Sequence, residues 1–294
     1  MSAATLPGNI RRPALLKAIY TELFHGGKSS AALASKAPTK IVGPNATVFR
    51  AFDHAYFTVD THRQILRRDQ ADNALIVRDE DSDQNRYTGK SHDASIPAWG
   101  GLYCSLQQQA TVNEVAHYVE KSRAQKATAA GNAVPAPLPR SAVLNSKCVI
   151  KINLLGPFIA VDLSPHNSYA RDFVESVGRA ESVKRALAFS GKATKSLWDA
   201  MYDPDDYSVG RGIGLGLAAY GYRSLVVQTA RQSERSSLER GDNIVFFGHQ
   251  KQRINNLSVV EAYLFPIAGG GFDDPNFIPG GAHSRQVITY PVGF

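Results

Sequence analysis

The chain has 294 residues, of which 43% are hydrophobic and 20% charged, and these values exclude a disordered chain or a fibre. The 33 Lys and Arg residues outnumber the 26 Asp and Glu residues, which gives a formal net charge of +7. This excess favours an anionic partner, and a nucleic acid, an anionic lipid or a phosphorylated small molecule would each fit it.

Cysteine usage and apolar stretches narrow the class of protein further. Cys104 and Cys148 form no Cys-x-x-Cys motif, so we expect neither a zinc ribbon nor a disulfide framework. The longest uncharged apolar stretches, residues 152–161 and 212–222, are shorter than the roughly 17 to 25 residues of a membrane-spanning helix. The first residues lack the pattern of a secretory signal. We therefore expect a cytoplasmic protein with no membrane partner, and delivery into a neighbouring cell stays open.

The periodicity of apolar residues predicts the secondary structure. In chain order it predicts a helix at 13–24, a small-residue stretch at 26–40, strands at 47–52 and 101–105, a helix bearing the stripe Val112, Val115, Ala116 and Val119, an exposed loop at 124–140, strands at 149–155 and 158–162, mostly helix at 169–198, a helix at 210–220, and strands at 224–229, 243–247 and 286–290. This mixture, without internal repeats, indicates an α+β fold. We divide the chain into an N-terminal arm (1–45), a main domain (46–265) and a C-terminal extension (266–294).

A glycine-rich segment at 212–219 contains Gly-x-Gly-x-x-Ala, which is part of the dinucleotide-binding fingerprint. That fingerprint requires a strand directly before it, whereas residues 201–209 are polar and contain three Asp residues and a Pro. We therefore expect the glycines to allow a helix to pack closely against a neighbouring strand.

The informative pattern is spread along the main domain. Arg50 lies in an expected strand, Arg86 and Tyr87 open a turn, and Tyr103 precedes Glu114 by eleven residues. Further along are Asp162-Leu-Ser164, the segment 222–231 and the segment 241–247. In order and spacing this pattern resembles the RES domain, the toxin half of bacterial toxin and antitoxin pairs whose partner is an Xre-like, helix-turn-helix antitoxin.

The resemblance implies an ADP-ribosyltransferase-like split β-sheet with flanking helices and an N-terminal helical arm. It also implies a site that breaks NAD, formed by Arg50, Tyr103, Glu114 and Thr229. Arg86 and Tyr87 would belong to the same NAD-binding site. The family has a serine where this chain has Thr229, and Ser224 or Ser233 are alternatives for that role. The resemblance implies NAD as substrate, no metal, and a proteinaceous antitoxin or immunity partner.

These residue types suit the chemistry. Breaking the nicotinamide glycosidic bond leaves positive charge on the ribose, which a carboxylate such as Glu114 stabilises. A guanidinium, as in Arg50 or Arg86, grips a pyrophosphate through two parallel hydrogen bonds. The ring of Tyr103 can stack on nicotinamide. The Thr229 hydroxyl would orient the ribose or the attacking water or phosphate.

Each residue also has a purely structural interpretation. Thr111 and Glu114 have the spacing of a capping box, although a helix that begins at Ser105 would place Glu114 in its interior. Arg50 would be a strand residue with its charged head in solvent. Tyr103 would be a core residue, and Thr229 an ordinary β-branched strand residue.

Three functions therefore stay open. The first is an NAD glycohydrolase or phosphorylase that arrests growth, and the second is ADP-ribosyl transfer to a protein. The third is a non-catalytic module that binds an anion or nucleic acid. The basic residues between 231 and 253 are interleaved with Glu234, Glu239 and Asp242, which argues against a nucleic-acid surface. The eight histidines show no metal-ligand spacing.

Overall fold

The computed structural model describes residues 10–25, 32–53, 75–77, 80, 85–136, 147–189, 196–203, 205–228, 241–249, 252, 254–264 and 285–289. Its helices are α1 (Pro13–Phe24), α3 (Gln108–Ala129), α5 (Ser168–Gly178), α6 (Glu181–Phe189), α7 (Leu197–Met201) and α8 (Ser208–Tyr220), with a 3₁₀ helix at Leu33–Lys36. Its strands are β1 (Thr39–Val42), β2 (Thr47–Asp53), β3 (Gly100–Ser105), β4 (Lys147–Leu154), β5 (Phe158–Leu163), β6 (Ser224–Gln228), β7 (Asp242–Gly248), β8 (Leu257–Leu264) and β9 (Arg285–Thr289). The α+β class predicted from the sequence is confirmed.

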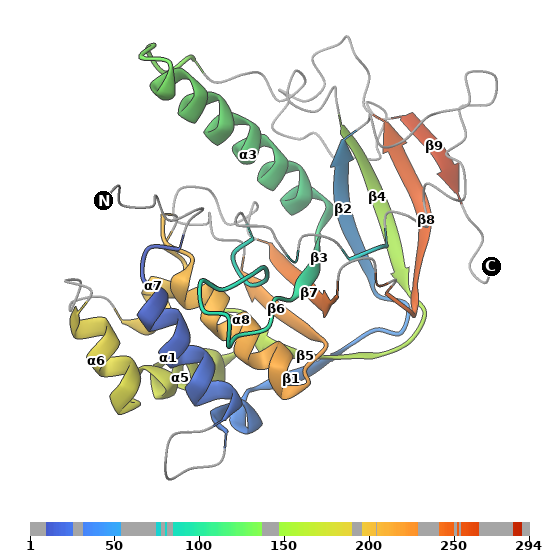
Figure 1. Ribbon diagram of the computed structural model, residues 1–294. Helices are drawn as coiled ribbons and strands as arrows, with labels where there is room; N and C mark the ends of the chain where they lie inside the picture. Colours follow the sequence, from blue (N-terminus) through green and yellow to red (C-terminus); the bar gives the residue numbers. More distant parts are fainter. Residues whose placement is uncertain are drawn as a thin grey trace.

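The described strands form one mixed sheet in the order β1-β5-β6-β7-β3-β2-β4-β8-β9 (Figure 1). Of the described neighbouring pairs, β5 and β6 run parallel and the others run antiparallel. A parallel pair needs a long crossover. Helices α5 to α8 lie between β5 and β6 in sequence and supply that connection.

The sheet is divided between β2 and β3. In the described strands these two pair at one register position, Phe49 opposite Ser105. By contrast, β2 pairs with β4 and β3 pairs with β7 along their whole lengths. We call β1, β5, β6, β7 and β3 the first strand group, and β2, β4, β8 and β9 the second. The two groups diverge from this junction (Figure 1), as in the split sheet that the resemblance implies.

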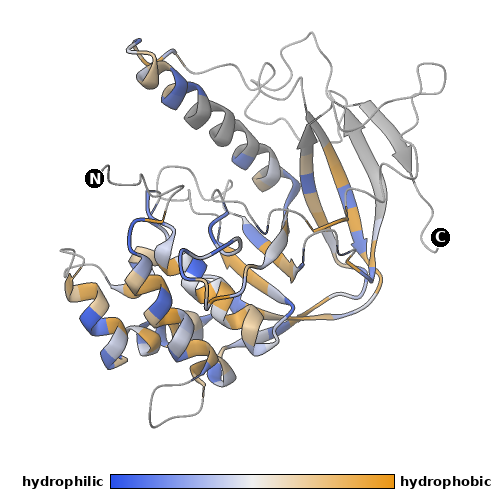
Figure 2. Cartoon of the chain, viewed as in Figure 1, coloured by the Kyte–Doolittle hydropathy of each residue, from blue (hydrophilic) through white to orange (hydrophobic). Residues whose placement is uncertain are grey.

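Each face of the first strand group borders a hydrophobic core. On one face, Leu102 and Ile244 are buried together with Val48 and Ile150 of the second group, so this core holds the two groups together. The other face is covered by helices that include α1, α5 and α8 (Figure 1). Hydrophobic residues are frequent along the strands at the centre of the molecule (Figure 2).

The glycines of α8 allow close contacts on two sides of the helix. A β-carbon at Gly216 would lie 2.7 Å from Cβ of Leu23 on α1. A β-carbon at Gly214 would overlap with the carbonyl group of Tyr87. The glycines therefore serve close packing, as expected from the sequence, but against a helix and a turn instead of a strand.

The structure corrects the expected element boundaries in three places. The helix α3 continues through residues 124–129, which the sequence analysis assigned to an exposed loop. The strands β1 and β8 were not expected. The run 169–198 contains two separate helices, α5 and α6, and the beginning of α7.

The N-terminal segment is integrated into the core. Leu15, Ile19 and Leu23 of α1 are fully buried in the cluster that also contains Val245 of β7. In the C-terminal segment, β9 pairs with β8 and extends the second strand group. The division into an arm, a domain and an extension stays a prediction.

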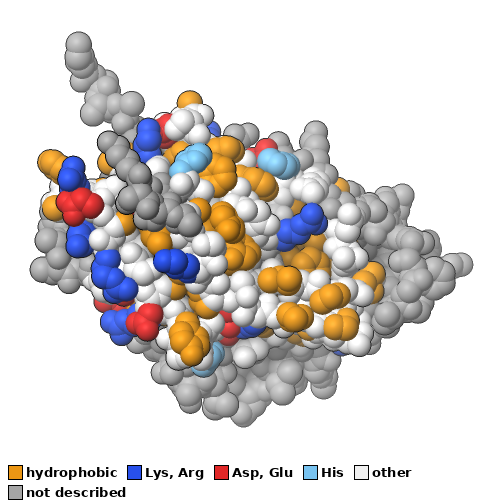
Figure 3. Space-filling model, turned by 90° about the horizontal axis from the view of Figure 1, so that it is seen from below, with side chains coloured by type: hydrophobic (Ala, Val, Ile, Leu, Met, Phe, Trp, Pro, Cys, Tyr) orange, Lys and Arg blue, Asp and Glu red, His pale blue; other side chains and the backbone are white. Residues whose placement is uncertain are grey.

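Some apolar side chains remain at the surface. Ile41 of β1 is 72% exposed and Ile159 of β5, directly opposite in register, is 60% exposed. Hydrophobic side chains gather on part of the face that Figure 3 shows. Within the described residues, no helix is both long and apolar enough to cross a membrane.

Candidate active site

Tyr103 connects β3 to the turn that contains Arg86 and Tyr87. Its hydroxyl accepts a hydrogen bond from the backbone N–H of Tyr87 (3.0 Å) and lies 3.2 Å from the hydroxyl of Thr88. Burial raises the pKa of Tyr103 to about 12, although the hydrogen bonds at this turn oppose that rise. The phenol is therefore protonated at neutral pH. The structure brings Tyr103 and Tyr87 together, and their part in an NAD-binding site stays a prediction.

The turn is also held from the α8 side. Arg211 is fully buried and donates hydrogen bonds to the carbonyl groups of Asn85 and Lys90. Together with the close approach of Gly214 to Tyr87, these bonds fix the backbone of residues 85–90. The role of Arg211 could not be predicted from the sequence, because its partners are backbone carbonyl groups far away in the chain.

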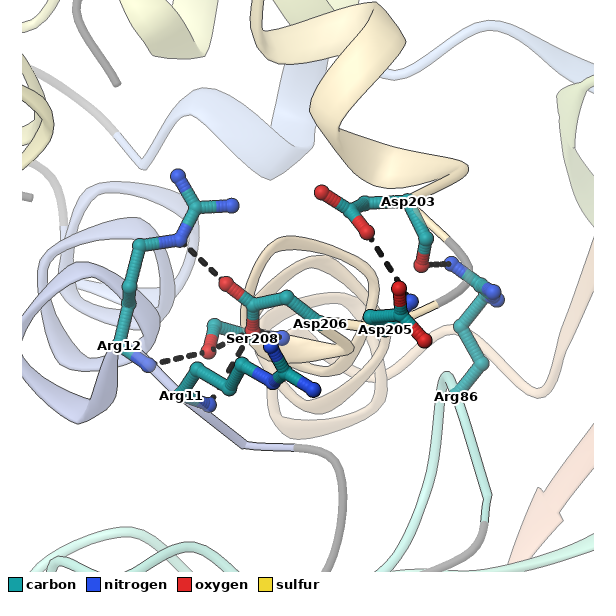
Figure 4. Close-up of polar contacts among 7 residues, drawn as sticks. All are labelled: Arg11, Arg12, Arg86, Asp203, Asp205, Asp206 and Ser208. Atoms are coloured by element: carbon teal, nitrogen blue, oxygen red, sulfur yellow. Dashed lines mark hydrogen bonds and ion pairs between the residues drawn. The ribbon is translucent and has the colours of Figure 1, made fainter. Parts of the chain in front are cut away.

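The side chain of Arg86 reaches the connection between α7 and α8. Its Nη1 donates to the carbonyl oxygen of Met201 at 2.8 Å. It also donates to the carbonyl oxygen of Asp203 at 2.8 Å (Figure 4). Its guanidinium carbon lies 4.3 Å from the ring centroid of Tyr207, which is within cation–π range. Arg86 therefore ties the turn to the helices, and phosphate binding by this residue stays a prediction.

Glu114 lies in the second turn of α3. The helix begins at Gln108, so Thr111 is inside it and the capping-box interpretation is wrong. The Thr111 hydroxyl instead donates to the carbonyl oxygen of Phe49 (3.3 Å), which connects α3 to β2 at the junction of the strand groups. Glu114 is partly buried at the same end of β3.

A hydrogen-bonded chain links Glu114 to the sheet. The amide Nδ2 of Asn243 donates to Oε1 of Glu114. The hydroxyl of Ser105 donates to Oδ1 of Asn243 at 2.8 Å. Ser105 and Asn243 were not among the residues predicted for the site. The available signal was a polar residue at one end of each of two apolar strands.

Arg50 lies on β2, one residue beyond the junction. Its positive charge acts on Cys104 of β3, although burial dominates and raises the pKa of that thiol to about 12. Because the thiolate is the reactive form of cysteine, Cys104 is unreactive at neutral pH. Cys104 and Tyr103 point to opposite faces of β3 because successive strand residues alternate. Arg50 thus lies on the Cys104 side.

The candidates for the serine role are described in part. Thr229 and Ser233 lie outside the described residues. Ser224 begins β6, opposite Phe246, and donates to the carbonyl oxygen of Ile159. The other end of β6, Gln228, pairs with Asp242 beside Asn243. Ser224 is therefore at the opposite end of β6 from the residue that holds Glu114.

Asp162 of β5 and Asp242 of β7 lie on the two strands that flank β6, and their charges interact. Asp162 accepts a hydrogen bond from the backbone N–H of Ser164 and pairs with Nζ of Lys40 at 3.2 Å. Burial raises the pKa of Asp242, and the charge of Asp162 adds to this rise, while Lys40 and His166 oppose it. The Asp-Leu-Ser motif ends β5, and the bond from the Ser164 N–H to Asp162 begins the turn that follows the strand. No cluster of metal-ligating side chains occurs among the described residues.

No family model and no curated protein matches the chain. Among solved structures, it is similar to a chain in the crystal structure of the M. tuberculosis MbcT–MbcA toxin–antitoxin complex, with 14% sequence identity and a TM-score of 0.40. The match covers 85% of this chain and 90% of that chain.

Proposed function

We propose that the protein is a toxin that cleaves the bond between nicotinamide and ribose in NAD, by hydrolysis or phosphorolysis, and thereby arrests growth. The observation that supports this most is the position of Glu114 relative to Tyr103. Asn243 links Glu114 to Ser105, which is two residues from Tyr103 on the same face of β3. Positions two apart in a strand are roughly 7 Å apart, within the size of a nicotinamide riboside.

The carboxylate of Glu114 supplies the main electrostatic contribution in this proposal. As the glycosidic bond breaks, positive charge develops on the ribose ring. A carboxylate held in a partly buried place stabilises that charge more than water does, because it needs no reorganisation. Nicotinamide leaves as a neutral base, and water or phosphate adds to the ribose carbon.

The remaining residues would bind the dinucleotide. Tyr103 would offer its ring to the nicotinamide, since its hydroxyl is already bonded to the turn. Because Arg50 lies on the Cys104 side, opposite to Tyr103, its contact with the pyrophosphate would require the dinucleotide to cross the junction of the two strand groups. Thr229 would orient the ribose or the attacking group. NAD is the substrate in this scheme, and no metal takes part.

The direct test follows NAD turnover by purified protein. Nicotinamide release is measured with and without phosphate, and the second product distinguishes hydrolysis (ADP-ribose) from phosphorolysis (a phosphorylated ADP-ribose). We expect Glu114→Gln to lower kcat at least about 100-fold, as for the loss of a main transition-state contact. Glu181→Gln is the matched control, because Glu181 is exposed on α6 and pairs with Arg185. Circular dichroism verifies folding.

Other outcomes would favour the alternatives. Label from NAD that stays on protein would indicate ADP-ribosyl transfer. Absence of turnover together with salt-sensitive binding of nucleic acid would indicate a non-catalytic module. Absence of nicotinamide release from folded protein under all these conditions would refute the proposed function.

The proposed activity implies a partner. A cytoplasmic enzyme that consumes NAD harms the cell that makes it, so we propose a protein antitoxin or immunity protein that blocks the site. We also propose that this partner protein resembles the Xre-like antitoxins. Expression of the wild-type chain in a bacterium should arrest growth, whereas the Glu114→Gln chain should not. Equal growth of the two strains at equal protein levels would contradict the toxin role.

A further inference from the structure

The linkage between Glu114 and the sheet goes beyond the residues that the family resemblance assigns. Glu114 belongs to α3, which runs away from the sheet after its first turns (Figure 1). A carboxylate on such a helix needs an anchor to keep a fixed position relative to β3. Asn243 and Ser105 provide that anchor from two paired strands, β7 and β3.

Both anchor residues are buried, at the ends of two strands that lie in the middle of the strand order. Asn243 is 7% exposed and lies between Val227 of β6 and Ser105 of β3 in register, and Ser105 is 2% exposed. Polar side chains in such positions are costly unless they are hydrogen-bonded. An aliphatic residue would suit the packing at either position, so these two polar residues call for an explanation.

The chemistry of the three groups sets the direction of the chain. An ionised carboxylate only accepts hydrogen bonds, so the amide must turn its NH₂ group toward Glu114. Its carbonyl oxygen then faces Ser105, whose hydroxyl donates to it. Ser105 thus holds the orientation of Asn243, and Asn243 holds the position of the Glu114 carboxylate.

We infer that Asn243 and Ser105 are positioning residues that fix the carboxylate of Glu114 for the cleavage of NAD. This inference rests on the proposed function. Neither residue contacts the reacting atoms in this scheme. Asn243 acts through Glu114, and Ser105 acts through Asn243.

The test compares steady-state NAD cleavage by variants of the full chain. Asn243→Ala should lower kcat about 10- to 100-fold, which corresponds to the loss of one hydrogen bond to a charged group. KM should change much less, because the anchor serves the transition state and not substrate binding. Ser105→Ala should have a smaller effect of the same kind. Asn132→Ala is the matched control, since Asn132 is exposed beyond the end of α3.

Two further variants separate positioning from folding. Asn243→Asp keeps the size of the side chain but replaces the NH₂ donor with a second carboxylate, so kcat should fall although the shape is retained. In a Glu114→Gln background, Asn243→Ala should reduce kcat by much less than in the wild type, because the group it positions is absent.

The outcomes distinguish the two proposals. A wild-type chain without NAD cleavage refutes the proposed function, and the positioning role falls with it. If the wild type cleaves NAD but Asn243→Ala and Asn243→Asp keep kcat, only the positioning role is overturned. Equal effects of Asn243→Ala in the two backgrounds, or a change in KM alone, would also overturn it.

Discussion

Tyr103 has a structural task that is separate from its proposed contact with NAD. Its hydroxyl accepts the backbone N–H of Tyr87 and contacts the hydroxyl of Thr88. Tyr87 and Thr88 are buried, so their polar groups have little access to water. The phenol therefore holds the turn on β3 even in the absence of a substrate.

We predict that Tyr103→Phe lowers the free energy of unfolding by about 1 to 3 kcal/mol, because a buried N–H loses its acceptor while the ring is kept. Urea denaturation at pH 7 measures this change. Tyr169→Phe is the control, since Tyr169 is 72% exposed and should give a change within about 0.5 kcal/mol. Equal stability of Tyr103→Phe and the wild type would show that the hydroxyl does not hold the turn.

Only some residues of the candidate site could be predicted from the sequence. Of the two residues chosen by their spacing, Tyr103 lies on β3, and Glu114 is linked to Ser105 at the end of β3 through Asn243. The link through Asn243 could not be read, because Asn243 and Glu114 are 129 residues apart and meet only after β7 pairs with β3. For Arg86, charge alone does not reveal that backbone carbonyl groups occupy its Nη1.

The helix α8 packs closely on two sides because it has glycines there. α1 packs against one side at Gly212 and Gly216, and the turn 85–90 packs against the other at Gly210 and Gly214. The helix therefore connects the N-terminal segment to the turn that contacts Tyr103. A helix with side chains at these positions would keep both neighbours farther away.

We predict that Gly214→Ala is strongly destabilising, by about 3 kcal/mol or more, because the new methyl group would overlap with backbone atoms that cannot rotate away. Thermal unfolding followed by circular dichroism measures the loss. Gly131→Ala is a control of a different kind, since its β-carbon would meet open space and only its φ of +70° is unfavourable. A smaller loss for Gly214→Ala than for Gly131→Ala would contradict this account of the packing.

The errors in predicting the elements have local causes. Residues 124–129 are rich in alanine and have high helix propensity, yet their small side chains gave no apolar stripe. The helix ends only where Gly131 adopts a positive φ. β1 has four residues, too few for a clear alternation. The composition of β8 is typical of a strand, so this strand could have been predicted from the sequence.

At the scale of the whole molecule, the sequence predicted the α+β class but not the strand order. Chain order does not place β3 between β7 and β2, or put the junction at Phe49 and Ser105, because each pairing joins distant segments. The net charge of +7 is likewise a property of the whole chain and identifies no site. The candidate site is defined instead by local features, which are the spacing of Tyr103 and Glu114 and the hydrogen bonds of Asn243 to α3 and β3.

One contact joins the N-terminal segment to the start of α8 across more than half of the chain. Asp206 is buried, with its side chain 2% exposed, and pairs with Nε of Arg12. It also accepts hydrogen bonds from the backbone N–H groups of Arg11 (3.2 Å) and Ser208 (2.9 Å) (Figure 4). Burial alone would raise the pKa of Asp206, but the hydrogen bonds from Ser208 and Arg12 and the charge of Arg12 outweigh it and lower that pKa.

Because the folded state lowers the pKa of Asp206, it favours the ionised form. The resulting stabilisation is present above the unfolded pKa of about 3.9 and is lost as the pH falls through the lower folded value.

We predict that Asp206→Asn lowers the free energy of unfolding at pH 7 by about 3 kcal/mol, since Arg12 keeps a largely buried charge without its partner. Urea denaturation at pH 7 and pH 3 should show this difference shrinking at the lower pH. Asp172→Asn, at an exposed position on α5, should change stability little at either pH. A difference between Asp206→Asn and the wild type that stays constant with pH would show that the charge of Asp206 does not provide the stabilisation.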